Sequence, residues 1–376
     1  MKRIVVVGNG IAGLTAADTL RTKGFDGRLT LIGDEFHAAY SRPALSKALL
    51  RDHDDVTSHE LPPARHGAEE RLGVCAIGLD VARRVIELDD GDEVPFDGLV
   101  IASGCRPRRL GPDDSGEVTL RTLDDALLLR RRIADKPTVV VVGGGPLGME
   151  IASGALEAGC AVTLVARKVA PLRHQLGAYL SGIFTDAARS RGLRIATTDA
   201  AVVTDDVHPI IVLSDGTHLP ADLVITAAGD HPNIEWLESS GLLGNGVLAV
   251  DERGRLAPGI VAAGDVATVP TALGARRIPL WNSAIEQAKT AATALLHGEG
   301  ATPLVHRPYF WTDQFGLSLK AVGDLPFDGV PTLLDTKPDD HTSALLRWGH
   351  AGRTGSVAAI NYRIPIPRLR KLGLAG

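Results

Sequence analysis

The feature that most constrains this chain is a glycine-rich motif that occurs twice. Residues 4–13 read IVVVGNGIAG, and residues 138–148 read TVVVVGGGPLG. Each motif has the spacing G-x-G-x-x-G directly after a β-branched run, and a small-residue helix pattern follows it. The first glycine makes a tight turn, the second lets the backbone approach a pyrophosphate, and the third lets the helix pack on the strand. The repeat predicts two dinucleotide sites, one at Gly8, Gly10 and Gly13 and the other at Gly143, Gly145 and Gly148.

The residues after the next strand differ between the two units. In the first unit, LTLI (29–32) is followed by Asp34 and Glu35, and an acid there bonds the ribose hydroxyls of an adenosine. In the second unit, AVTLVA is followed by Arg167 and Lys168 instead. These cations could pair with a 2′-phosphate, which favours NADPH over NADH. The alternative is that both are solvated surface cations, and NADH then stays possible.

Two dinucleotides in one chain indicate electron transfer between them, and FAD with NAD(P)H is the pair that fits.

The composition, 44% hydrophobic and 23% charged over 376 residues, is that of a globular protein of two or three domains. A net charge of −5 argues against a nucleic-acid binder. No apolar run reaches the ~18 residues of a membrane span, and the N-terminal run breaks at glycines, so we expect a cytoplasmic protein. Three cysteines without a CxxC pair argue against a dithiol site, and no HExxH spacing indicates a metal site.

The elements divide the chain into three predicted domains. Residues 1–113 and 232–306 form a discontinuous FAD-binding domain, residues 114–231 an NAD(P)H-binding domain, and residues 307–376 a C-terminal α+β domain. The discontinuity is inferred from a helix at 283–296, whose small residues suit close packing against the first dinucleotide unit. A strand that ends at Gly264 and Asp265 is expected to lead into a helix. The overall class is α/β, with two Rossmann-like domains.

Several further motifs carry a family resemblance across essentially the whole chain. They include GDE followed by YSRPALSK (40–47), LRTLDDALLLR, AAGDVA, WNSAIEQA and FWTDQFG (310–316). With them, the sequence resembles the FAD-dependent ferredoxin reductases of the putidaredoxin-reductase type, which serve cytochrome P450s and bacterial dioxygenases. Glutathione-reductase-like enzymes share the architecture but would carry CxxxxC where this chain has SRPALS. The resemblance implies FAD, NADPH or NADH, and an iron–sulfur ferredoxin that feeds a P450 or oxygenase. We expect no nucleic-acid or membrane partner, from the charge and hydropathy above, and a monomer or homodimer.

The resemblance also implies roles for individual residues. Gly8, Gly10, Ala12 and Gly13 would cradle the FAD pyrophosphate, and Asp34 or Glu35 would hold the ribose. The other implied cofactor contacts are Arg42, Lys47, Ala76, Ala102, Gly104, Arg121, Gly229, Gly264, Asp265, Trp281 and Trp311. Trp281 departs from the smaller or acidic residues usual at its position. Trp311 could line an electron route to the surface or be a core aromatic.

Lys47 and Glu150 are the predicted catalytic pair. The resemblance places Lys47 beside the flavin ring with Glu150 as its partner, and a charge-assisted pair there would order the site. A purely structural salt bridge is the alternative.

Two other functions fit the same motifs. One is an NAD(P)H oxidase, although such enzymes typically need a redox cysteine near the position of Arg42. The other is an NADH-sensing flavoprotein that acts through partner binding. A ferredoxin is usually acidic, so a reductase should present cations such as Arg307, Arg368, Arg370 and Lys371.

Overall fold

The structure is a computed structural model that describes residues 1–51, 57–112, 114–204, 209–349 and 355–374. Its contacts group the chain into two compact units. Unit 1 comprises Met1–Ser41, Glu60–Arg106 and His231–His306, and unit 2 comprises Arg42–His59, Pro107–Asp230 and Arg307–Gly376. The division into FAD-binding, NAD(P)H-binding and C-terminal domains remains a prediction.

Unit 1 is built on a six-stranded sheet in the order β17-β18-β7-β1-β2-β3. The strands are β17 (Arg255–Ala257), β18 (Ile260–Ala262), β7 (Gly98–Ile101), β1 (Arg3–Val7), β2 (Arg28–Gly33) and β3 (Glu69–Leu72). All neighbours are parallel except β17 and β18. The apolar runs of β1, β2 and β7 are buried almost throughout, as strands covered on both faces must be.

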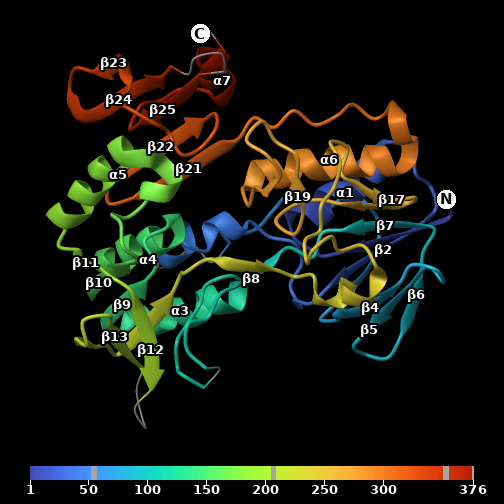
Figure 1. Cartoon of the computed structure of the whole chain (residues 1–376), viewed down its shortest axis with the longest axis horizontal. Helices are drawn as coiled ribbons and strands as arrows, with labels where there is room; N and C mark the ends of the chain where they lie inside the picture. Colours follow the sequence, from blue (N-terminus) through green and yellow to red (C-terminus); the bar gives the residue numbers. More distant parts are fainter. Residues whose placement is uncertain (52–56, 113, 205–208, 350–354, 375–376) are drawn as a thin grey trace. The chain divides into compact units, whose positions relative to one another are not determined.

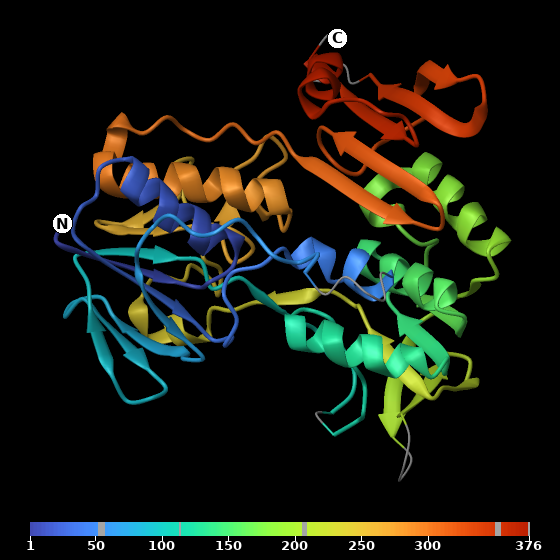
Figure 2. The ribbon, with the colours of Figure 1, turned by 180° about the vertical axis from the view of Figure 1, so that it is seen from behind.

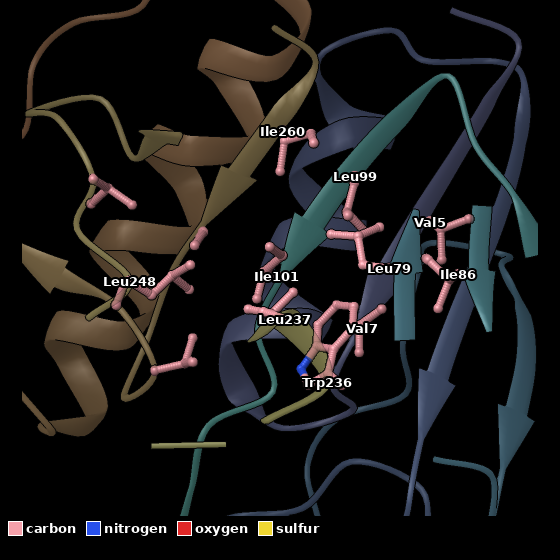
Figure 3. Close-up of a cluster of buried hydrophobic side chains, with 14 of the residues drawn as sticks. Val5, Val7, Leu79, Ile86, Leu99, Ile101, Trp236, Leu237, Leu248 and Ile260 are labelled. Atoms are coloured by element: carbon pink, nitrogen blue, oxygen red, sulfur yellow. The ribbon is translucent and has the colours of Figure 1, made fainter. Parts of the chain in front are cut away.

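Each face of this sheet has its own cover. Helices α1 (Ile11–Thr22) and α6 (Trp281–His297) pack together on one face, where alanines of both helices are buried (Figures 1 and 2). This is the packing predicted for the helix at 283–296. The other face carries the antiparallel sheet β4 (Ala76–Asp80), β5 (Val85–Leu88) and β6 (Glu93–Pro95), with the 3-10 helix η2 (Glu235–Ser240). Figure 3 shows Trp236 of η2 among the side chains of this second core.

Three short elements complete unit 1. They are β19 (Thr268–Val269), β20 (Arg276–Arg277) and η3 (Gly298–Gly300). The prediction of a helix directly after Gly264 and Asp265 is wrong. Thr268 and Val269 instead form a strand that pairs antiparallel with Arg277 and Arg276. Strands β8 (Cys105–Pro107) and β16 (Asp230–Pro232) pair where the chain leaves and re-enters the unit.

Unit 2 contains a second parallel sheet, in the order β11-β10-β9-β15. Its strands are β11 (Arg194–Thr197), β10 (Ala161–Ala166), β9 (Thr138–Val142) and β15 (Leu223–Thr226). Helices α3 (Leu123–Ala134), α4 (Pro146–Glu157) and α5 (Arg173–Ser190) belong to the same unit. A smaller antiparallel sheet joins β12 (Ala200–Thr204), β13 (Pro209–Leu213) and β14 (His218–Pro220).

The C-terminal part of unit 2 is an antiparallel sheet in the order β21-β22-β25-β24-β23. These strands are β21 (Tyr309–Gln314), β22 (Leu317–Val322), β25 (Ser356–Ile360), β24 (Asp340–Trp348) and β23 (Thr332–Lys337), and α7 (Ile366–Leu374) packs on them. The YSRPALSK segment forms η1 (Arg42–Ala44) and leads into α2 (Ala48–Arg51). The predicted α/β class with a C-terminal α+β part is confirmed. Among the described helices, none is both long and apolar enough to cross a membrane.

Candidate functional site

The carboxyl edge of the unit 1 sheet gathers most of the residues predicted to bind FAD. Parallel strands end at a common edge, and dinucleotides bind there in open α/β sheets. Gly8 N donates to Ile32 O at 2.8 Å, Ala102 N to Val7 O at 2.7 Å, and Ala263 N to Ile101 O at 3.0 Å. These bonds link the ends of β1, β2, β7 and β18. The glycine turn, Asp34, Glu35, Ala102, Gly264 and Asp265 therefore lie at one edge.

Two glycines of this turn leave no room for a side chain. Gly8 has φ +115°, and a Cβ there would lie 2.1 Å from Ala102 O. A Cβ on Gly13 would lie 1.8 Å from Gly8 O, so α1 packs directly against the turn. Helix α1 has Gly10 as N-cap, no side-chain cap and no acid in its first turn. Its first N–H groups are therefore oriented for an anion, and the cradle fits the pyrophosphate of FAD.

The predicted ribose and ribitol ligands have defined neighbours. Asp34 is exposed, whereas Glu35 is half-buried and accepts a 2.6 Å hydrogen bond from the Tyr40 hydroxyl. Arg277 Nη1 donates to the backbone oxygen of Asp265 at 3.1 Å. Sequence reasoning missed Tyr40, although it lies in the YSRPALSK motif.

The other residues of unit 1 that are predicted to contact FAD lie on several different elements. Gly264 N donates to the side-chain oxygen of Gln287 at 2.9 Å, which ties the end of β18 to α6. Trp281 is the first residue of α6 and is partly buried. Ala76 begins β4 and packs against the second core, and Gly104 O accepts from Asn233 N.

The second glycine fingerprint has the same geometry as the first. Gly143 has φ +129°, and a Cβ there would lie 2.2 Å from Ala227 O. A Cβ on Gly148 would lie 2.0 Å from Gly143 O. Helix α4 begins at Pro146 with Gly145 as N-cap and again has no side-chain cap. The unit 2 sheet therefore carries a second glycine turn with an uncapped helix, and this cradle fits a pyrophosphate as the first one does. Gly229 is exposed with φ +104°, and its oxygen accepts from Arg108 N.

The two cations after β10 share one carboxylate that sequence reasoning did not identify. Arg167 Nε lies 2.9 Å from Asp199 Oδ1, and Lys168 Nζ lies 3.3 Å from Asp199 Oδ2. Desolvation raises the pKa of Asp199, but the hydrogen bonds from Lys168 and Arg167 outweigh it, and the pKa lies below its usual range. Both cations are therefore paired with Asp199, and the preference for NADPH predicted from them stays a prediction.

Glu150, on α4, is the centre of a buried polar cluster in unit 2. The carboxylate is 5% exposed and accepts from Lys47 Nζ at 2.8 Å, from Thr312 Oγ1 at 2.5 Å and from Ser46 Oγ. Lys47 Nζ also lies 5.8 Å from the centroid of the Trp311 ring. Buried carboxylates are tolerated when paired and hydrogen-bonded in this way. Sequence reasoning paired Lys47 with Glu150 but missed the hydroxyls of Ser46 and Thr312.

Two more predicted FAD ligands lie together in unit 2. Arg42 Nη1 donates to the backbone oxygen of Arg121 at 2.9 Å. Asp125 accepts from the backbone N–H groups of Arg121 and Thr122, and Thr122 in turn caps α3. The capping box thus fixes the backbone that Arg42 contacts. Roles for both arginines in FAD binding stay predictions.

Comparison with known proteins places this architecture in a family. The family described as "Pyridine nucleotide-disulphide oxidoreductase" matches residues 2–288, so the chain belongs to it. Its resemblance to the ferredoxin reductase type is confirmed by curated relatives and a solved structure.

The relatives are similar over most of their length. The "p-cumate 2,3-dioxygenase system, ferredoxin--NAD(+) reductase component" of Pseudomonas putida is 36% identical over 86% of this chain and 82% of its own. The "Chlorobenzene dioxygenase, ferredoxin reductase component" of Cupriavidus sp. (strain PS12) is 36% identical over 95% of this chain and 89% of its own. The "covalent putidaredoxin reductase-putidaredoxin complex" is 28% identical with a TM-score of 0.88, over 99% of this chain and 93% of that one.

Proposed function

We propose that this chain is an FAD-dependent reductase that passes electrons from NADH to a [2Fe–2S] ferredoxin, which then feeds an oxygenase or a P450. The observation that carries the proposal is the pair of uncapped glycine cradles, one in each parallel sheet. Two cradles of this kind in one chain suit two dinucleotides. The names of the relatives from P. putida and Cupriavidus supply the donor and acceptor.

The residues of unit 1 would hold FAD. The turn at Gly8 and the N-terminus of α1 would bind the pyrophosphate, Asp34 or Glu35 the adenosine ribose, and Asp265 the ribitol. When bound, FAD accepts a hydride from NADH and releases single electrons to an iron–sulfur centre. The cradle at Gly143 and Gly148 would bind the pyrophosphate of NADH.

The Glu150 cluster would act by positioning one cation. The hydroxyls of Ser46 and Thr312 and the ammonium of Lys47 satisfy the carboxylate oxygens. Lys47 is thereby held at a fixed position beside Trp311. A fixed ammonium can stabilise negative charge that develops nearby, because it needs no reorganisation during the reaction.

The proposed ferredoxin contact uses the basic residues of α7. Arg368 and Lys371 are exposed three residues apart, so they lie on one face of the helix, and Arg307 is exposed as well. An acidic ferredoxin would be steered toward such cations at low salt. The cytoplasm is the proposed location, and a monomer or homodimer the proposed assembly.

Anaerobic stopped-flow spectroscopy tests this function. The FAD-loaded protein is mixed with NADH, and a [2Fe–2S] ferredoxin is then added in low and high salt. We expect rapid bleaching of the flavin, followed by ferredoxin reduction that slows as salt rises. Rapid bleaching without ferredoxin reduction, but with oxygen consumption in air, would instead identify an NADH oxidase. A long-lived charge-transfer band without onward transfer would identify a sensor flavoprotein.

A further inference from the structure

The second dinucleotide unit lacks an acid at the position where a Rossmann unit normally carries one. Strand β10 ends at Ala166, and Arg167 and Lys168 follow directly. A carboxylate after this strand is what lets such a unit bind the free 2′-hydroxyl of NADH and reject a 2′-phosphate. The chain supplies a carboxylate at the same place from a different strand.

Backbone contacts place Asp199 next to the glycine turn. A Cβ on Gly144 would lie 2.9 Å from the Cβ of Ala166, so the turn touches the end of β10. Thr198 N donates to Ala166 O at 2.9 Å, and Ser214 N donates to Asp199 O at 3.0 Å. The first bond holds the residues after β11 beside the end of β10, and the second ties Asp199 to the residue after β13. Asp199 therefore lies at the carboxyl edge of β10 and β11, beside the cradle.

We propose that Asp199 is the residue that makes this site specific for a nicotinamide dinucleotide without a 2′-phosphate. Its two carboxylate oxygens engage Arg167 and Lys168 separately, so a 2′-phosphate would have to compete with Asp199 for both cations. The carboxylate also repels a phosphate dianion, while it remains able to accept a hydrogen bond from a ribose hydroxyl. The inference rests on the proposed function only in assigning the nicotinamide dinucleotide to the second cradle.

The ion pairs are exposed, which makes the substitution mild for the fold. The side chains of Asp199, Arg167 and Lys168 are 41%, 78% and 68% exposed. Exposed pairs contribute little to stability, so Asp199→Asn should fold normally. The charge-conserving variant Asp199→Glu tests whether the carboxylate itself is required. Asp186→Asn is the matched control, because Asp186 is an exposed aspartate on α5 of the same unit.

The test is calorimetric titration of the FAD-loaded protein with NAD⁺ and with NADP⁺. We expect wild type, Asp199→Glu and Asp186→Asn to bind NAD⁺ more tightly than NADP⁺. In Asp199→Asn the preference should fall by about tenfold or more, the effect of removing one charge a few ångströms from a phosphate. Part of this fall should be a gain in NADP⁺ affinity that comes from the released cations. Adding Arg167→Gln and Lys168→Gln to Asp199→Asn should therefore abolish that gain.

Two results would overturn the inference. One is an unchanged preference in Asp199→Asn, and the other is a wild-type protein that already prefers NADP⁺. Both are read from binding alone and do not depend on electron transfer to a ferredoxin. A protein that fails to reduce ferredoxin but shows the expected shift would refute the proposed function and leave Asp199 as the specificity residue.

Discussion

At the scale of single residues, the arrangement around Glu150 has consequences for stability as well as for the site. The carboxylate balances a lysine that is only 14% exposed, and two hydroxyls complete its hydrogen bonds. Removing one member of a buried pair leaves the other charge uncompensated, which costs more than the pair itself contributes. Lys47 is thus expected to destabilise the folded state when Glu150 is removed, because its charge is then buried without a partner.

We predict that Glu150→Ala lowers the free energy of unfolding of unit 2 by about 3–5 kcal/mol. Replacing the lysine as well, in Lys47→Met/Glu150→Ala, should recover part of this loss because no buried charge then remains. Urea unfolding followed by tryptophan fluorescence gives both values, since Trp311 lies beside the lysine. A double variant that is less stable than Glu150→Ala would show that the charge imbalance is not the cause.

Part of this cluster could be predicted from the sequence. Lys47 and Glu150 were linked through the motifs that carry them, and the structure shows the ion pair. The hydroxyls of Ser46 and Thr312 could not be assigned, because nothing local marks a donor that meets its acceptor 104 or 162 residues away. Asp199 was missed for a related reason, since it follows a strand other than the one where an acid is expected.

At the scale of elements, the two strand–turn–helix units depend on glycines that contact backbone. In the β1–α1 and β9–α4 turns, the third residue of the helix packs against the carbonyl oxygen of the first glycine of the turn, and the helix N-termini have no side-chain caps. By contrast, α3 is capped by Thr122 within a complete capping box. A helix start that carries no cap of its own is suited to receive one from a ligand.

We predict that Gly13→Ala and Gly148→Ala have different effects, because the two cradles serve different dinucleotides. Gly13→Ala forces a Cβ to within 1.8 Å of Gly8 O and should yield protein without bound FAD. Gly148→Ala makes the same clash in the second unit, and it should retain the yellow FAD while flavin reduction by NADH is lost. Absorbance at the flavin band and stopped-flow reduction distinguish them.

The control for these glycine variants is Gly182→Ala. Gly182 lies in α5, and a Cβ there meets nothing within 4 Å. Alanine is the better helix former by about 1 kcal/mol, so this variant should be slightly more stable with both cofactor functions intact. If Gly148→Ala were reduced by NADH at the normal rate, the second cradle would not be the NADH site.

The elements themselves were largely predictable, and so was the packing of α6 on α1, but the strand order was not. A fingerprint is local, because strand, turn and helix are adjacent in sequence. The strand order β17-β18-β7-β1-β2-β3 depends on segments up to about 250 residues apart, and no spacing in the sequence encodes it. The prediction of a helix after Asp265 failed for the same reason, because the pairing of Thr268 with Arg277, and not the local sequence, decides the structure there.

At the scale of the whole molecule, the carboxylates with lowered pKa values predict that acid destabilises the folded state. Carboxylates with pKa values below their usual range occur in both units, among them Asp97, Asp251, Glu299, Asp335 and Asp340. A group whose pKa is lowered by folding stabilises the folded state above its unfolded pKa. That contribution is lost as the pH falls through the folded pKa.

We predict that Asp97 contributes to acid sensitivity between about pH 4 and pH 2. Hydrogen bonds from the Arg3 side chain and from the backbone N–H groups of Lys2 and Arg3 lower its pKa to about 2. Asp97→Asn should be less stable than wild type at neutral pH, and the difference should shrink as the pH approaches 2. Thermal unfolding at a series of pH values checks this, with Asp186→Asn as control. A constant difference at all pH values would contradict it.

The sequence separations within the Glu150 cluster also set an order of events during synthesis. Glu150 leaves the ribosome after Ser46 but long before Thr312, which lies 162 residues further on and whose hydroxyl donates a hydrogen bond to it. A nascent chain that ends before β21 therefore carries this carboxylate with its set of donors incomplete. Domains generally fold as units from the N-terminus onward. The hydrogen bonds of the cluster are therefore complete only after β21 has been translated and has packed against α4.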